Sequence, residues 1–375
     1  MLNYIIWDVR PYLAEIGNFE LHWYSILFAL AFFFGFKIMT SIYTSEGRTE
    51  ADVEKLAIYM FLATLIGARL GHCIFYDWEY FHNHILEIFL PVEFEPEFKF
   101  TGFRGLASHG AAFGIIFSIW LYSRKYKDQR FLYVLDRIVI VVALAGACIR
   151  LGNLMNSEII GKPAESFSSF VFTYPTHERL VGVFGESTIQ DVEFKKLNKD
   201  TILFTYPATA LKMTLTTKRM DSAQAFVTTN IWEAINYAPG YPEHIILPIN
   251  KNSMYMGTRI IDQNTQAIDV LVYGIPRYPA QLFEALSSLL LFLLLYGLYR
   301  KFGKDTPEGL LFGLFVVILF SLRFVYELLK ENQSQFEDGM DWNMGQILSI
   351  PLVLGGIFVL IRAYKIHSKN KELSQ

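Results

Sequence analysis

The chain of 375 residues has few charged residues, few cysteines and no excess of basic residues, and each shortage excludes a class of protein. Charged residues make up 18% of the chain, against roughly 25% in an average soluble domain. A net charge of −3 with 53% hydrophobic residues excludes intrinsic disorder, which requires low hydrophobicity and high net charge. The pI near 6.3 provides no basic surface for nucleic acid, so we expect no nucleic-acid partner.

The two cysteines, Cys73 and Cys148, both lie in apolar segments, where buried small side chains are the expected interpretation. Two cysteines are too few for a disulfide framework, and no spacing of Cys and His resembles a zinc site. The N-terminal segment lacks a basic leader followed by an apolar core, so the first apolar segment is expected to act as its own signal. We expect neither a metal nor a cofactor.

Long apolar segments are abundant. A helical crossing of the bilayer needs roughly 20 mostly apolar residues, and seven segments qualify. They are 21–39, 56–76, 106–122, 138–154, 279–299, 309–329 and 345–364. The third and fourth are shorter and rich in Gly and Ala, which suits closely packed helices. The sequence predicts an all-α polytopic membrane protein with seven transmembrane helices.

The charges between these segments predict the orientation of the chain. Basic residues gather at 124–130, 300–304 and 362–371, whereas the alternate connections, 77–105 and 330–344, carry an excess of acidic residues. Because basic residues stay on the cytoplasmic side, the N-terminus is expected outside and the C-terminus inside. Four spans then fall in residues 1–161, and three spans with a cytoplasmic tail in residues 278–375.

The connection formed by residues 162–277 falls on the outer side. It contains 11 basic and 11 acidic residues and seven of the thirteen prolines, as an ordinary soluble domain would. Alternation of apolar and polar residues at 211–216 predicts a strand, and 200–206 and 269–273 have similar patterns. We expect an inserted extracytoplasmic domain that is rich in β-structure.

A few ionisable residues lie inside the apolar segments, where each costs about 2.5–3.5 kcal/mol and is therefore a candidate for function. They are Arg69, His72, His109, Arg150, Glu284, Arg323 and Glu327. With the predicted orientation all seven lie toward the outer side, which indicates a polar cavity that opens outward. Lys37 and Asp136 lie near segment edges, where their side chains can reach the interface, and no second cluster is expected on the inner side.

The surplus of arginine over glutamate favours an anion site, because guanidinium groups bind phosphate in a bidentate manner and phospholipid headgroups lie at this depth. Each of these ionisable residues also has a purely structural interpretation. Arg323 and Glu327 are one turn apart and can satisfy each other. The polar residues after Arg150 can form an ordinary helix C-terminus, and His109 can be structural instead of an acid or base.

Three motifs stand out in the sequence, at residues 150–161, at Ser108-His109-Gly110 and at residues 278–284. They resemble, in that order, the signature, the His-Gly-Gly region and the H-P-x-Q-L-Y-E segment of the prolipoprotein diacylglyceryl transferase family of bacterial membrane enzymes. Further likenesses occur at 21–24, at 67–71 with Phe75-Tyr76, at Arg323 with Glu327, and at 344–349. The chain departs from the family pattern at Ala111, Ser157, Tyr278, Phe283 and Leu319, and the segment 162–277 is longer than the family's head.

The resemblance implies transfer of the diacylglyceryl group of phosphatidylglycerol to the lipobox cysteine of a prolipoprotein signal peptide. It implies His109 as the base and Arg150 and Arg323 as the groups that stabilise the departing phosphate. The other expected substrate-binding residues are Tyr24, Arg69, Asn153, Asn156, Glu158, Gly161, Gln281, Glu284 and Glu327. The expected location is the bacterial cytoplasmic (inner) membrane, with the active site on the periplasmic side.

Two other functions use intramembrane charges. A small-anion or lipid transporter would place ionisable groups near the bilayer midplane and have related halves, and neither feature is found in the sequence. A receptor would leave these charges without a role.

Overall fold

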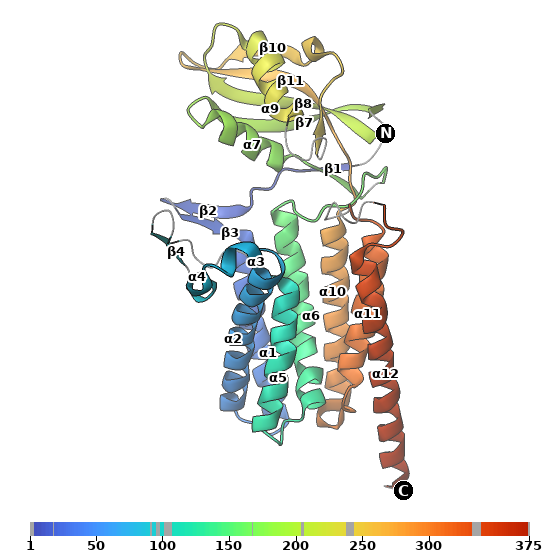
Figure 1. Ribbon diagram of the computed structural model, residues 1–375. Helices are drawn as coiled ribbons and strands as arrows, with labels where there is room; N and C mark the ends of the chain where they lie inside the picture. The colour runs from blue at the N-terminus through green and yellow to red at the C-terminus, as the bar shows by residue number, and fades with distance from the viewer. Residues whose placement is uncertain are drawn as a thin grey trace. The chain divides into compact units, whose positions relative to one another are not determined.

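The computed structural model describes residues 4–17, 19–90, 92–94, 98–100, 107–166, 168–203, 206–237, 244–331 and 339–373. The chain divides into two compact units. Unit 1 consists of Met1–Ala29, Gly146–Ser287 and Leu322–Ser349, and unit 2 of Leu30–Ala145, Ser288–Ser321 and Ile350–Gln375. The boundaries between the units fall inside several long helices, whose course along the chain can be followed in Figure 1.

Six of the described helices are long and apolar enough to cross a membrane. They are α1 (Trp23–Ser45), α2 (Glu50–Phe75), α6 (Phe131–Met155), α10 (Ala280–Phe302), α11 (Leu310–Glu327) and α12 (Met344–Leu373). They coincide with six of the seven predicted segments, which confirms a polytopic, mainly helical membrane protein. The segment 106–122 overlaps α5 (Ser108–Lys125), which is not among the six because it begins with polar residues and ends in Arg124 and Lys125.

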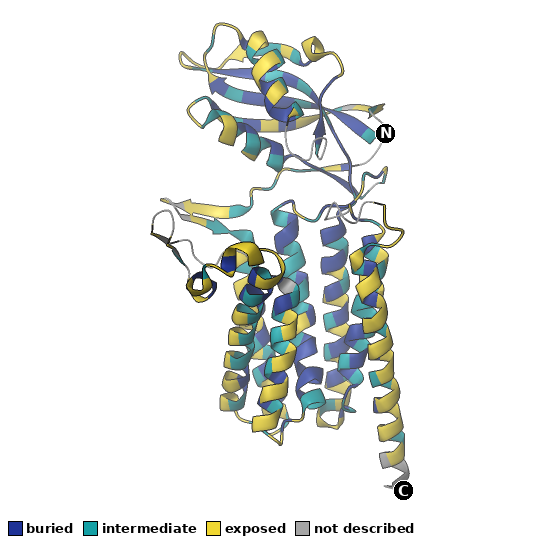
Figure 2. Ribbon diagram, viewed as in Figure 1, coloured by how far each residue is buried: buried dark blue, intermediate teal, exposed yellow. Residues whose placement is uncertain are grey.

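Large apolar side chains are exposed along these helices, and Figure 2 colours most of the length of α12 as exposed. Phe33 on α1, Phe61 on α2 and Phe358 on α12 each expose about half or more of their surface. In water such surface would be costly, whereas lipid tails are as apolar as these side chains.

In unit 2, α2 and α5 are in contact at the backbone. A Cβ atom on Gly67 would lie 2.5 Å from the carbonyl oxygen of Gly110, and one on Gly114 would lie 2.6 Å from that of Ala63. Small residues are therefore required at both places, which explains why the sequence is rich in glycine here.

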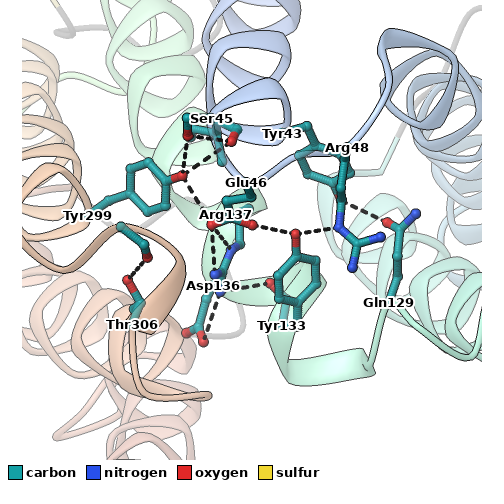
Figure 3. Close-up of polar contacts among 12 residues, drawn as sticks. Tyr43, Ser45, Glu46, Arg48, Gln129, Tyr133, Asp136, Arg137, Tyr299 and Thr306 are labelled. Carbon is teal, nitrogen blue, oxygen red and sulfur yellow. Dashed lines mark hydrogen bonds and ion pairs between the residues drawn. The ribbon is translucent and has the colours of Figure 1, made fainter.

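A buried polar network joins α1, α6 and α10 in unit 2 (Figure 3). Arg137 Nη2 lies 2.9 Å from Glu46 Oε1, and the Tyr299 hydroxyl donates to the same oxygen at 3.0 Å. Both side chains of the ion pair are almost completely buried, at 1% and 4% exposed. The expectation of no second cluster of ionisable residues is wrong, because Glu46 and Arg137 form a buried pair although both lie outside the predicted apolar segments.

Asp136 lies beside this network and is fully buried. Its carboxylate accepts hydrogen bonds from the backbone N–H groups of Gly309 at 2.7 Å and Phe312 at 2.8 Å. The first N–H groups of a helix have no partner within it, so Asp136 supplies the missing acceptor to α11. The expectation that this side chain reaches the interface is therefore wrong.

Unit 1 contains an antiparallel sheet in the order β10–β11–β8–β7, with β9 also paired to β11. The strands are β7 (Ile189–Leu203), β8 (Tyr206–Lys218), β9 (Ile245–Ile246), β10 (Tyr255–Ile260) and β11 (Thr265–Gly274). Met213 pairs with Val270 and Leu215 with Ile268, and all four side chains are buried. The predicted strands 211–216 and 269–273 lie within β8 and β11.

The predicted strand 200–206 is wrong as a single element. Leu203 pairs with Tyr206, so the segment contains the end of β7 and the start of β8. Residues 204–205 lie outside the described residues. Alternation of side chains is the same on both arms of a hairpin, and it does not reveal where the chain reverses.

The remaining elements are short. Two strands, β1 (Tyr4–Trp7) and β6 (Ser169–Phe172), pair in parallel, and β2 (Tyr12–Ile16) pairs with β3 (Phe19–His22) as a hairpin. The other short elements are α3 (Trp78–Phe81), α4 (Ile85–Phe89), β4 (Val92–Glu93), β5 (Lys99–Phe100), α7 (Tyr174–Phe184), α8 (Ala223–Ala225), η1 (Phe226–Ile231), α9 (Trp232–Asn236), η2 (Lys251–Ser253) and η3 (Gly303–Asp305).

Candidate active site

The first half of the site is built from the end of α6 and the start of α10 in unit 1. Arg150 Nε lies 2.5 Å from Glu284 Oε2, and Arg150 Nη1 donates to Asn153 Oδ1 at 3.3 Å. Asn153 in turn donates to Glu158 Oε2 at 3.1 Å, and Asn156 donates to Oε1 at 3.2 Å. The signature segment therefore holds Arg150 through a chain of carboxylate and amide groups.

A tight turn after α6 brings Glu158 back toward the helix. Ser157 and Ile159 have φ angles of 54° and 55°, in the left-handed region. The Glu158 N–H donates to the Asn153 carbonyl at 2.9 Å, which closes the turn. Left-handed backbone favours glycine, so Ser157 and Ile159 are held in this conformation at a cost in free energy.

Gly161 lies where three backbone segments meet. A Cβ atom on Gly161 would lie 2.7 Å from Tyr278 Cβ and 3.0 Å from the Leu329 carbonyl oxygen. Its carbonyl accepts from Arg277 Nη1 at 3.1 Å, and the Gln281 amide donates to the Glu158 carbonyl nearby. The geometry gives Gly161 a role in backbone packing.

Tyr24, at the start of α1, packs against α6 at Gly152. A Cβ atom on Gly152 would lie 2.6 Å from Tyr24 Cδ2 and 3.3 Å from its Cα. The glycine in the signature therefore allows this ring to lie against the helix one turn before Asn156.

The second half of the site is formed by the end of α11 and the start of α12. Arg323 Nη2 lies 3.5 Å from Glu327 Oε1, so the two form the pair that the spacing permits. Glu327 Oε2 also accepts from Asn343 Nδ2 at 3.2 Å, and its carboxylate lies against Gly345. Asn343 and Gln346 cap each other at the start of α12. Glu327 is thus buried while 45% of the Arg323 side chain stays exposed.

One residue of the site, Lys330, was missed in the sequence. Its side chain is 2% exposed, and its ammonium group contacts Glu284 and lies 3.6 Å from Glu327 Oε1. It joins the Arg150 pair to the Arg323 pair. Lys330 follows Glu327 by three residues, a spacing typical of helical ion pairs that was a usable signal, but it lies after the end of α11 and beyond the apolar segment 309–329.

Arg69 and His109 belong to unit 2. Arg69 donates to the carbonyls of Glu87 at 2.7 Å and Ile88 at 3.1 Å, so it holds the short helix α4. His109 is partly buried, and its ring lies 5.4 Å from that of Phe75 and 5.7 Å from that of Tyr76. The aromatic contacts fix the orientation of the imidazole at the start of α5.

Within unit 1 the structure brings together most of the predicted site. These residues are Tyr24, Arg150, Asn153, Asn156, Glu158, Gly161, Gln281, Glu284, Arg323 and Glu327. In unit 2, His72 pairs with Asp77 at 2.8 Å. Among the described residues, no group of three or more His, Cys, Asp or Glu side chains is arranged to hold a metal ion.

Comparison with known proteins supplies an independent observation. The sequence model of the prolipoprotein diacylglyceryl transferase family matches residues 11–362. A phosphatidylglycerol–prolipoprotein diacylglyceryl transferase of Bacteroides fragilis is 33% identical over 362 residues, which are 96% of this chain and 95% of the relative. Enzymes of the same name from Tolumonas auensis and Chloroherpeton thalassium are 30% and 28% identical, over 96% and 97% of this chain and 98% and 96% of their own lengths.

Proposed function

Because the chain belongs to the prolipoprotein diacylglyceryl transferase family, we propose that it transfers the diacylglyceryl group of phosphatidylglycerol to the lipobox cysteine of prolipoprotein signal peptides. One observation carries the chemistry. Arg150 and Arg323 are the more exposed members of a charged cluster whose other members, Glu284, Glu327 and Lys330, are buried. Guanidinium groups held in this way are suited to binding a phosphate.

The reaction has two requirements. The thiol proton must be removed, and His109 is the proposed base. The resulting thiolate attacks the glycerol C3 carbon of the lipid, so a C–S bond forms as the C–O bond to phosphate breaks and glycerol phosphate leaves. The leaving phosphate gains negative charge, which Arg150 and Arg323 stabilise. No redox step occurs.

The other predicted residues act on these groups. Asn153, Asn156 and Glu158 orient Arg150, and Gln281 holds the turn that carries Glu158. Glu284 and Glu327 hold the two arginines, and Tyr24 contributes to the headgroup site. We propose that Arg69 is also a substrate-binding residue; its guanidinium donates to the carbonyls of Glu87 and Ile88.

We further propose seven crossings, with α5 as the third, the N-terminus outside and the C-terminus inside. The charge bias of the connections supports this orientation. Residues 162–277 are then an extracytoplasmic domain inserted between membrane segments 1–161 and 278–375, and the reaction takes place on the periplasmic side of the bacterial inner membrane. The transporter alternative is not supported, since the relatives described above are named as transferases.

The decisive experiment mixes the purified protein with phosphatidylglycerol vesicles and a lipobox peptide and measures the thioether product by mass spectrometry. We expect product with the cysteine peptide and none with its serine counterpart. A matched control is Arg259→Ala, which removes an arginine whose side chain is 65% exposed in β10 and leaves the site intact. Absence of product from folded protein would overturn the proposal.

A further inference from the structure

Lys330 lies at the centre of the charged cluster and follows the end of α11. Its side chain is 2% exposed, and its ammonium group contacts two carboxylates, those of Glu284 and Glu327. Burying an ammonium ion without a partner of opposite charge is strongly unfavourable. The two carboxylates therefore neutralise the charge of Lys330, and Lys330 in turn offsets part of their negative charge.

The five charges alternate in sign along the cluster, in the order Arg150, Glu284, Lys330, Glu327 and Arg323. The three central side chains are at most 10% exposed, whereas Arg150 is 24% and Arg323 is 45% exposed. The arginines are thus the two accessible ends of a chain with a buried centre.

The carboxylate oxygens of Glu284 and Glu327 contact several partners. Glu284 uses Oε2 for Arg150 and Oε1 for Lys330. Glu327 uses Oε1 for both Arg323 and Lys330, and Oε2 for Asn343. Lys330 therefore shares Glu284 with Arg150 and Glu327 with Arg323, so each carboxylate has a second, buried cation beside its arginine.

We infer that Lys330 is a positioning residue that keeps both arginines available to the phosphate of the lipid. The inference rests on the proposed function, because that function supplies the phosphate. Without Lys330, two buried carboxylates face two arginines, and each guanidinium is drawn toward its carboxylate. The affinity for phosphate should then fall at both ends of the cluster together.

The test compares Lys330→Met with Lys330→Arg, which keeps the charge, and with Lys195→Met, which removes a lysine that is 67% exposed in β7. For each variant we would measure kcat and KM for phosphatidylglycerol with the lipobox peptide, the dissociation constant for the lipid alone, and the unfolding temperature. We expect Lys330→Met to raise KM and the dissociation constant by about tenfold or more. Lys330→Arg should recover most of this loss, and Lys195→Met should leave all three unchanged.

Three results would overturn the inference. In the first, Lys330→Met has the kcat, KM and lipid affinity of the unmodified protein. In the second, Lys330→Met and Lys330→Arg lose activity equally and unfold at an equally lowered temperature, as a purely structural lysine would. In the third, the unmodified protein does not bind phosphatidylglycerol. If the unmodified protein binds the lipid in a Lys330-dependent manner but forms no thioether, the transfer reaction is wrong and the positioning role stands.

Discussion

Arg150 Nε lies 2.5 Å from Glu284 Oε2, so the end of α6 and the beginning of α10 are joined by an ion pair within unit 1. Glu284 also contacts Lys330, so removal of Arg150 does not leave this carboxylate without a cation. A substitution at Arg150 therefore tests chemistry more directly than it tests folding.

We expect Arg150→Ala to lower kcat for thioether formation by about 100-fold or more, the usual loss when one stabilising donor of a transition state is removed. Arg150→Lys should be intermediate, since lysine keeps the charge and loses the planar pair of donors. The measurement is the rate of product formation at saturating lipid. Near-normal rates for Arg150→Ala, with Arg259→Ala as the control, would exclude the phosphate role.

His109→Gln should slow thiol attack by roughly 10²–10⁴-fold, since glutamine retains hydrogen bonding but accepts no proton. The loss should shrink as the pH rises toward the pKa of the free thiol, where base assistance is no longer needed. Rates across pH check this. His367→Gln, which changes an exposed histidine of α12, serves as the control. An unchanged pH profile in His109→Gln would mean that another group is the base.

Gly161→Ala should lower the free energy of unfolding by about 1–3 kcal/mol, because the new methyl group meets backbone atoms of Tyr278 and Leu329 that have little room to move. The same substitution at Gly182, on α7, meets no atom within 4 Å. Gly182→Ala should be neutral or stabilising, since alanine favours helix. Thermal unfolding of both variants decides the matter, and equal effects would contradict the packing role of Gly161.

Arg137→Met should destabilise the protein by about 3–5 kcal/mol, because it leaves the Glu46 carboxylate buried without its cation. The double variant Arg137→Met with Glu46→Gln should recover part of this loss, since the amide carries no charge. Arg130→Met, at a side chain that is 75% exposed, is the control. Additive losses in the double variant would show that the two residues are not coupled.

We expect the stability of the sheet in unit 1 to depend on pH, because the side chain of His244 is buried there. Burial, together with the charge of Arg277, lowers the pKa of His244 from 6.5 to about 4. The unfolded chain therefore binds a proton before the folded one does, so stability is complete above about pH 6.5 and falls by about 1.4 kcal/mol per pH unit toward pH 4.

Hydrogen exchange near β9 and β11 measures this effect, and the Ile275 N–H, which donates to the His244 carbonyl, is a suitable probe. Protection should fall between about pH 7 and about pH 5, and His244→Gln should flatten the slope. An equal slope in the variant would assign the pH dependence to another group.

Much of the site could be predicted from the sequence, because an ionisable group inside an apolar segment costs free energy and is therefore a candidate for function. This cost identified Arg150, Glu284, Arg323 and Glu327, and the structure places all four in one cluster. Lys330 escaped because it follows the apolar segment, although tertiary contacts bury it as deeply as any of them. Hydropathy is averaged over consecutive residues, whereas the burial of a side chain depends on which residues of the fold pack around it.

The sequence by itself determined that this chain is a helical membrane protein, which segments form its long apolar helices, and which motifs belong to the transferase family, because apolar length and local spacing are properties of consecutive residues. Only the tertiary structure decided which distant residues contact one another. Asp136 caps a helix that begins far along the chain at Leu310, Gly161 admits two distant backbone segments, and Lys330 joins two ion pairs. These contacts depend on which distant residues the fold brings within a few ångströms, and no periodicity in the chain records that.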